Sequence, residues 1–108
     1  MAEESDKRSE GRSACDADIE WAYFNKPDGH PARLLNVSQS GGYFECSHAI
    51  IPGATILIRL HQSMPGPPAE PEATPLRTAA LGEVKWCREL AGRRSVAYGI
   101  GIRYYLPV

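Results

Sequence analysis

Two short clusters of side chains in this 108-residue chain could bind an anion. The first is a pair of arginines, Arg8 and Arg12, four residues apart near the N-terminus. In an extended segment, residues four apart lie on the same side, about 13 Å from one another at a rise of about 3.3 Å per residue. Each guanidinium can make two hydrogen bonds to a phosphate or to the guanine O6/N7 edge, and it can also stack on a base. The pair could therefore grip one elongated anion.

The second cluster lies at the end of a predicted strand and contains Asn36, Ser38 and Gly41. Strand alternation predicts that the Asn36 amide and the Ser38 hydroxyl share one face, while Gly41 lets the backbone approach a ligand closely. Each cluster alone has a simpler interpretation. Paired arginines in a charged tail are usually solvated, and Asn-x-Ser before glycine is usually turn chemistry. Spacing alone therefore does not establish a binding site.

The remaining aromatic and ionisable residues favour structural roles. Trp21 and Trp86 occupy alternating strand positions, which favours packing in the core or at its rim over stacking on a base. The histidines lie in or beside turns without a partner at metal-ligand spacing, so we expect no metal site. No nucleophile with a base and no paired carboxylates are visible, so we expect no catalytic residues, no enzyme and no cofactor. The three histidines are His30, His48 and His61.

Composition limits the classes of protein further. Hydrophobic residues make up 43% of the chain and charged residues 23%, which is typical of one globular domain. The net charge of −1 argues against a protein that coats nucleic acid. No long apolar run is present and the N-terminus is too polar for a signal peptide, which predicts a cytoplasmic protein that does not insert into membranes. Cys15, Cys46 and Cys87 are widely spaced, which predicts free thiols.

The elements that must position both clusters are short strands. Residues 1–16 are charged and almost free of apolar side chains, which predicts a flexible N-terminal arm before a domain at 17–108. Prolines between Pro65 and Pro75 exclude a helix or central strand, so 61–77 is expected to be an exposed connection. Short strands separated by turns favour a sandwich or a closed barrel. About six are predicted, in 19–23, 32–37, 43–46, 55–60, 78–87 and 96–105.

The chain as a whole resembles the PilZ domain family, which combines Arg-x-x-x-Arg near the N-terminus with a later Asp/Asn-x-Ser-x-x-Gly motif. Arg8, Arg12, Asn36, Ser38 and Gly41 match every position of that pair. The resemblance implies an all-β, six-stranded antiparallel β-barrel of the split-barrel type, with the arm wrapped around a bound cyclic di-GMP. Asn36, where many relatives have Asp, removes a charge that would repel phosphate. The later strands also resemble the family, in 51–60, 82–86 and 98–104, and little or no C-terminal helix follows.

Three functions are consistent with these observations. The resemblance favours a stand-alone bacterial receptor that binds cyclic di-GMP and acts on an unidentified protein partner. The alternative is a PilZ-like protein-interaction module that does not bind nucleotide. A single-stranded nucleic-acid binder on a similar barrel would need a basic groove with exposed aromatics, and the near-neutral charge of the chain disfavours it.

Overall fold

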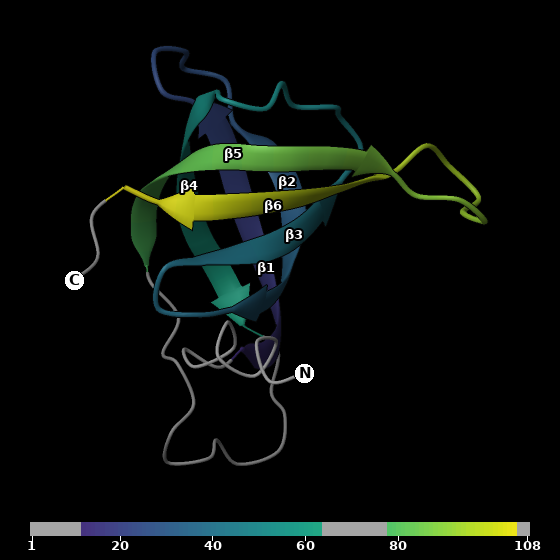
Figure 1. Cartoon of the computed structure of the whole chain (residues 1–108), viewed down its shortest axis with the longest axis horizontal. Helices are drawn as coiled ribbons and strands as arrows, with labels where there is room; N and C mark the ends of the chain where they lie inside the picture. Colours follow the sequence, from purple (N-terminus) through teal and green to yellow (C-terminus); the bar gives the residue numbers. More distant parts are fainter. Residues whose placement is uncertain (1–11, 64–77, 106–108) are drawn as a thin grey trace, which may run out of the picture.

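Six antiparallel strands close into a barrel (Figure 1), which confirms the predicted all-β fold. The computed structural model describes residues 12–63 and 78–105. Around the barrel the strands follow the order β1-β2-β3-β6-β5-β4, so every strand has a hydrogen-bonded neighbour on each side. Within the described residues there is no helix, and so none that could span a membrane. The strands are β1 (Ser13–Tyr23), β2 (His30–Val37), β3 (Gly41–Cys46), β4 (Thr55–Ser63), β5 (Ala79–Glu89) and β6 (Tyr98–Tyr104).

Strands β1 and β4 are longer than the local sequence pattern indicates. β1 begins at Ser13, so residues 13–16, which the sequence assigned to the arm, belong to the barrel. β4 continues to Ser63 and takes in His61, which had been assigned to the proline-rich connection. Both extensions are stabilised by pairing between distant segments, since Ser13 pairs with Val37 and Ala17 pairs with Ser63. The prolines of that connection and Arg8 lie outside the described residues.

The core fills the barrel with side chains from alternate positions of each strand. Trp21 of β1 is 1% exposed and Phe44 of β3 is fully buried, and the two are the largest of the fully buried side chains. Trp21 is therefore a core residue, as its strand position predicts. The remaining core residues are Ala17, Ile19, Leu34, Val37, Cys46, Ile50, Ile56, Ile58, Val84, Ile100, Ile102 and Tyr104.

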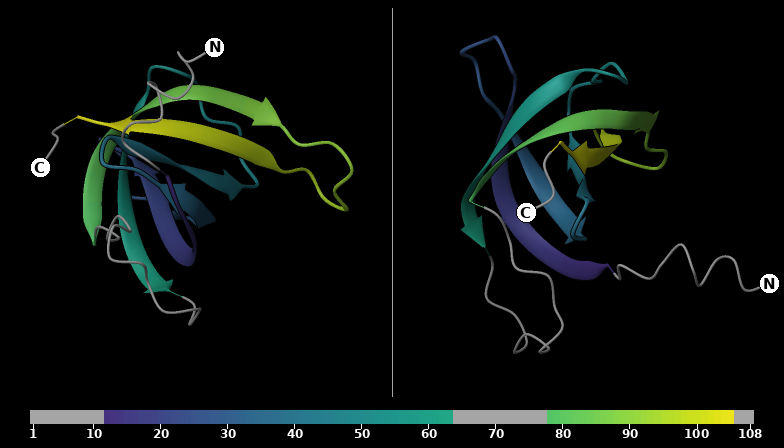
Figure 2. Two further views of the ribbon diagram at one scale, coloured as in Figure 1. Left: turned by 60° about the horizontal axis from the view of Figure 1, so that its bottom comes forward. Right: turned by 60° about the vertical axis from the view of Figure 1, so that its left-hand side comes forward.

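Two β-bulges change which side chains face outward. One lies between Leu34 and Asn36 in β2, and the other between Val84 and Trp86 in β5. Because Leu34 and Val84 are buried, plain alternation would also turn Asn36 and Trp86 into the barrel. The extra residue in each bulge reverses the alternation, so both side chains lie on the outer surface. The hairpin of β5 and β6 extends beyond the barrel, as two further views show (Figure 2).

Candidate ligand-binding site

The two sequence motifs meet at the start of β1. Arg12 immediately precedes this strand and is exposed, and its guanidinium Nη1 donates a hydrogen bond of 3.1 Å to the Asn36 Oδ1 atom. Asn36 lies near the end of β2, where it pairs with Ala14 of β1 and Tyr43 of β3. Because Arg8 lies outside the described residues, the structure brings together Arg12 and the second motif.

Ser38 and Gly41 shape the turn that follows β2. Ser38 is only 8% exposed, and its backbone N–H donates a hydrogen bond of 2.8 Å to the Gly41 carbonyl. Asn36 is partly exposed, so the two side chains do not share one open face as alternation predicted. The difference arises because β2 ends at Val37 and the chain turns at Ser38.

Gly41 is needed where β3 meets β6. A β-carbon at this position would collide with the Ile102 carbonyl oxygen of β6. The sequence predicted that Gly41 lets the backbone approach a ligand, whereas the close approach in the structure is to a neighbouring strand. Gly41 therefore has a packing role in the fold itself.

Strands β3, β6 and β5 lie side by side in the barrel (Figure 1), and they carry an aromatic surface that continues from Asn36. Tyr43 of β3 and Trp86 of β5 both pair with Gly101 of β6. Their rings stack across this glycine with centroids 5.7 Å apart and planes inclined by 27°. A β-carbon at Gly101 would overlap the Trp86 indole, so the missing side chain allows the rings to lie across β6. The outer surface thus carries a flat aromatic platform beside Asn36.

Charged groups surround this platform. The Arg88 guanidinium lies 5.1 Å from the Trp86 ring centroid, a cation–π contact. Glu45 accepts a hydrogen bond of 2.8 Å from the Tyr43 hydroxyl and one of 3.0 Å from Arg93 Nη2. Burial, followed by the bond to Glu45, raises the pKa of Tyr43 to about 12, so this hydroxyl stays a donor at neutral pH. We define the aromatic face as Asn36, Tyr43, Trp86 and Arg88.

The three histidines and the three cysteines all lie in the part of the chain that the structure describes. His30 and His48 lie with ring centroids 4.8 Å apart, and His61 Nε2 lies 2.9 Å from Glu20 Oε1. The three cysteines are free, and burial raises the pKa of the Cys46 thiol, which disfavours the reactive thiolate. In residues 12–63 and 78–105, no group of three or more His, Cys, Asp or Glu side chains could hold a metal ion.

Sequence reasoning missed most of the aromatic face. Trp86 is 40% exposed and contacts Tyr43, whereas its strand position favoured packing in the core or at its rim. The available signal was the Gly99-Ile100-Gly101 alternation of β6, which leaves the outer side of a strand without side chains. Such a strand predicts that large side chains from its neighbours lie across it.

Comparison with known proteins assigns no function to this site. No protein-family model matches the chain, and no curated protein matches it significantly. The residues and their geometry are therefore the basis for a function.

Proposed function

We propose that this chain is a PilZ-type receptor module that binds cyclic di-GMP on the aromatic face and passes the signal to a protein partner. The observation that carries the proposal is the 3.1 Å hydrogen bond between Arg12 and Asn36, which joins the two motifs beside a stacked Tyr43–Trp86 pair. A guanine nucleotide requires these same kinds of group: a planar surface for the base, and donors for its edge and its phosphates.

Each part of the ligand has a chemical counterpart on this surface. The exposed Trp86 ring offers a stacking surface for one guanine, and Arg88 is already held against that ring. The Arg12 fork is exposed, so it can exchange its single bond to Asn36 for paired bonds to a phosphate or to guanine O6/N7. Arg8 would supply the second fork from the arm.

The electrostatics of the surface also suit a doubly charged ligand. Asn36 is neutral, so the amide that holds Arg12 does not repel phosphate. Glu45, whose carboxylate accepts the hydrogen bond of the platform's Tyr43, is also paired with Arg93. Arg12 and Arg88 then remain to attract the phosphates.

The proposed activity is binding without catalysis, in the bacterial cytoplasm. Cyclic di-GMP would order the arm over the aromatic face and so change the surface offered to a partner. The competing proposal is an interaction module that does not bind nucleotide. The exposed aromatic face also meets one requirement of a single-stranded nucleic-acid binder, so an oligonucleotide belongs in the test.

Calorimetric titration with cyclic di-GMP at fixed salt tests the proposal. Binding should weaken about ten- to a hundredfold in Arg8→Ala and in Arg12→Ala, the expected loss of one bidentate contact of about 1 to 3 kcal/mol. Arg12→Lys should recover only part of the loss, because lysine keeps the charge without the planar fork. Ser38→Ala should weaken binding less, by under about 1 kcal/mol, because its side chain is buried in the turn after β2. Trp86→Ala should weaken it by about tenfold through lost stacking.

Three controls make the outcome decisive. Cyclic di-AMP keeps both phosphates but lacks guanine O6, so it should bind weakly. Arg94→Ala removes one exposed arginine from the hairpin loop and should leave the affinity unchanged. Oligothymidine should not compete. If wild type does not bind cyclic di-GMP, the interaction-module proposal replaces this one, whereas tight and salt-dependent binding of oligothymidine would favour the nucleic-acid binder.

A further inference from the structure

A second surface of the barrel, formed by β1, β4 and β5, is apolar at its centre. Ala22 of β1 pairs with Leu57 of β4, and Leu57 pairs with Leu81 of β5. Tyr105 continues this row, because its backbone N–H donates a hydrogen bond of 3.1 Å to the Leu81 carbonyl. Ala22, Leu57 and Leu81 belong to the outward positions of their strands, since the neighbouring inward residues fill the core, and Tyr105 directly follows β6. Phe24, which directly follows β1 and donates a backbone hydrogen bond of 3.0 Å to the Thr55 carbonyl, completes what we define as the apolar face.

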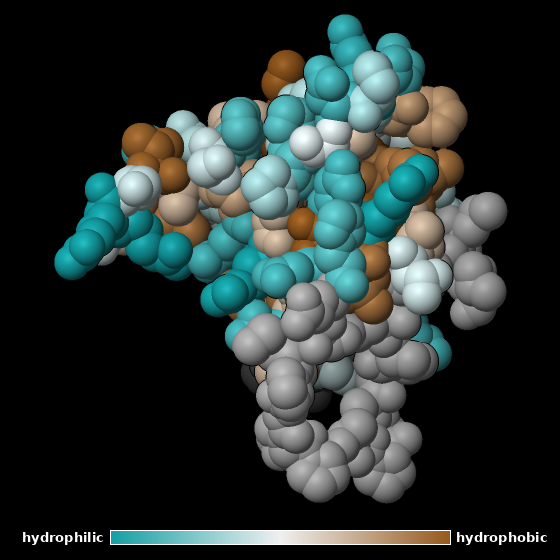
Figure 3. Space-filling view, turned by 180° about the vertical axis from the view of Figure 1, so that it is seen from behind, coloured by the Kyte–Doolittle hydropathy of each residue, from teal (hydrophilic) through white to brown (hydrophobic). Residues whose placement is uncertain are grey.

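This surface exposes more large apolar side chains than the fold needs. Phe24 is 64% exposed, Tyr105 is 46% exposed and Leu81 is 39% exposed. Figure 3 shows the rear of the molecule, where brown hydrophobic surface lies at the right-hand side beside polar residues, with smaller brown areas at the top and the left. Monomeric proteins rarely expose a contiguous apolar patch with a polar rim unless it binds something.

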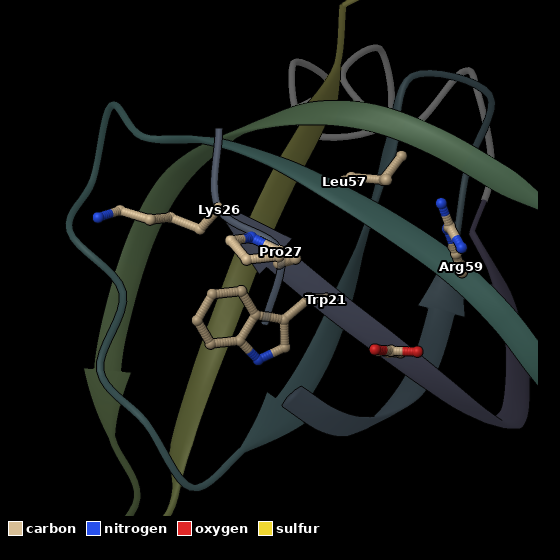
Figure 4. Close-up of a pocket in the computed structure, with 7 residues that line it drawn as sticks. Trp21, Lys26, Pro27, Leu57 and Arg59 are labelled. Carbon is tan, nitrogen blue, oxygen red and sulfur yellow. The ribbon is translucent and has the colours of Figure 1, made fainter. Parts of the chain in front are cut away.

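A shallow pocket at the edge of the apolar face adds a place for an inserted side chain (Figure 4). Ala22, Leu57 and Pro27 line it, with Lys26 and Arg59 on opposite sides of its rim. Neither Lys26 nor Arg59 forms an ion pair with any residue that the structure describes. The pocket therefore combines apolar side chains with two positive charges at its rim.

Acidic groups also lie near the pocket. Glu20 lines it and pairs across the strands with Arg59, and its Oε1 atom lies 2.9 Å from His61 Nε2. Glu83 of β5 lies 3.7 Å from the Lys85 Nζ atom. Lys26 and Arg59 are the basic side chains of the pocket lining, and they are the groups here that can pair with an external carboxylate.

We propose that the apolar face is the docking surface for a partner protein, and that it takes a segment carrying apolar side chains flanked by carboxylates. One apolar side chain enters the pocket beside Leu57, and the carboxylates pair with Lys26 and Arg59. Aromatic and arginine side chains, of the kind present here, are enriched among residues that dominate binding energy at interfaces.

A second copy of the chain fits this surface less well. It would bring another Lys26 and Arg59 to the interface, while its acidic groups Glu20 and Glu83 remain bonded within their own barrel. Burying unpaired cations against one another is unfavourable, so charge favours a partner of different sequence over self-association.

The docking surface extends the proposed adaptor role, yet its test uses no nucleotide. A phage library of random twelve-residue peptides is selected on the immobilised full chain, and the enriched peptides are synthesised and titrated by calorimetry. We expect sequences that combine apolar residues with two or more Asp or Glu. Their affinity should fall about tenfold in Leu57→Glu and in Arg59→Glu.

Matched variants separate this proposal from its competitors. Arg94→Glu makes the same charge change on the hairpin and should alter the affinity less than about twofold. Arg12→Ala should leave peptide binding intact, so failure of nucleotide binding and failure of docking are distinguishable. Thermal melts of each variant confirm that the barrel is folded.

Four results would overturn the proposal. One is a selection that enriches basic or purely polar peptides, or that enriches no peptide. A second is equal loss of binding in Arg59→Glu and Arg94→Glu, which would indicate unspecific attraction. The third is concentration-dependent dimerisation in sedimentation that Leu57→Glu abolishes, which would make a second copy the occupant. The last is binding to phosphatidylglycerol vesicles that Leu57→Glu abolishes, which would make a membrane surface the occupant.

Discussion

The aromatic face and the apolar face occupy different sides of one barrel and differ in what lies at the centre of each. Across β3, β6 and β5 the central residue is Gly101, and the rings on either side lie over it within a network of hydrogen bonds and charges. Across β1, β4 and β5 the central residue is Leu57, whose side chain offers apolar contact area but no hydrogen-bonding group. A glycine at the middle of a sheet row thus builds a surface suited to a flat polar ligand, and a leucine builds one suited to a protein.

The largest expected effect is on the side of the aromatic face. Gly41→Ala should lower the free energy of unfolding by about 2–4 kcal/mol, because the new β-carbon collides with the Ile102 carbonyl oxygen of β6. Urea unfolding of Gly41→Ala and wild type measures this loss of stability. Gly92→Ala is the control, because that glycine has a φ of 75° but nothing within 4 Å, and it should cost only about 1 kcal/mol. Equal stability of Gly41→Ala and wild type would show that β3 and β6 are not packed as described.

A smaller effect is expected from Gly101→Ala, which tests the platform itself. The added methyl displaces the Trp86 ring, so the stacked pair with Tyr43 is lost at a cost of about 1 kcal/mol. Acrylamide quenching of tryptophan fluorescence should increase, and the change reports Trp86 because Trp21 is only 1% exposed. Leu57→Ala, on the apolar face, should leave quenching unchanged. If Leu57→Ala changes the quenching as much as Gly101→Ala does, the two faces are not independent.

Alkaline pH probes the hydrogen bond of the aromatic face. The pKa of Tyr43 is raised to about 12, so folding favours the neutral phenol. Its contribution to stability is present below the unfolded pKa of about 10 and is lost as pH rises from about 10 to 12. The stability difference between wild type and Tyr43→Phe should therefore shrink between pH 9 and pH 11.5 in urea unfolding. A constant difference would mean that folding does not raise the pKa of Tyr43.

The smallest effect is expected on the apolar face. Leu81→Gln and Phe24→Ser should each change the free energy of unfolding by no more than about 0.5 kcal/mol, because Leu81 is 39% exposed, Phe24 is 64% exposed and neither belongs to the core. Thermal and urea unfolding are the measurements. A loss of 2 kcal/mol or more, about the cost of a core truncation, would show that these residues belong to the core of the protein.

Local pattern was sufficient to predict the strands of the barrel. Ile19, Trp21 and Tyr23 alternate with smaller or charged residues, and the β-branched run from Thr55 to Leu60 has the length of a strand. The ends of the strands were less predictable. Ser13 joins β1 because Val37 pairs with it, and a local window contains no information on that distant partner.

The candidate site was predictable only in part. The contact between Arg12 and Asn36 agrees with the motif pair, because the order and spacing of the motifs are properties of the sequence. The outward direction of the Trp86 side chain was not predictable, since it depends on a bulge that plain alternation does not include. Tyr43 and Trp86 meet only because β6 lies between β3 and β5, and that arrangement is set by pairing across the whole barrel.

The bulge in β5 places one extra residue, Lys85, between Val84 and Trp86, which pair with consecutive residues of β6. Deleting Lys85 would make Val84 and Trp86 consecutive, and plain alternation would still place their side chains on opposite faces of β5. Replacing Lys85, which is exposed, also changes neither direction. We therefore expect evolving descendants of this chain to tolerate both many residues at position 85 and its loss, whereas loss of Cys87, which pairs with Ile100, would reverse the facing of the residues that follow it.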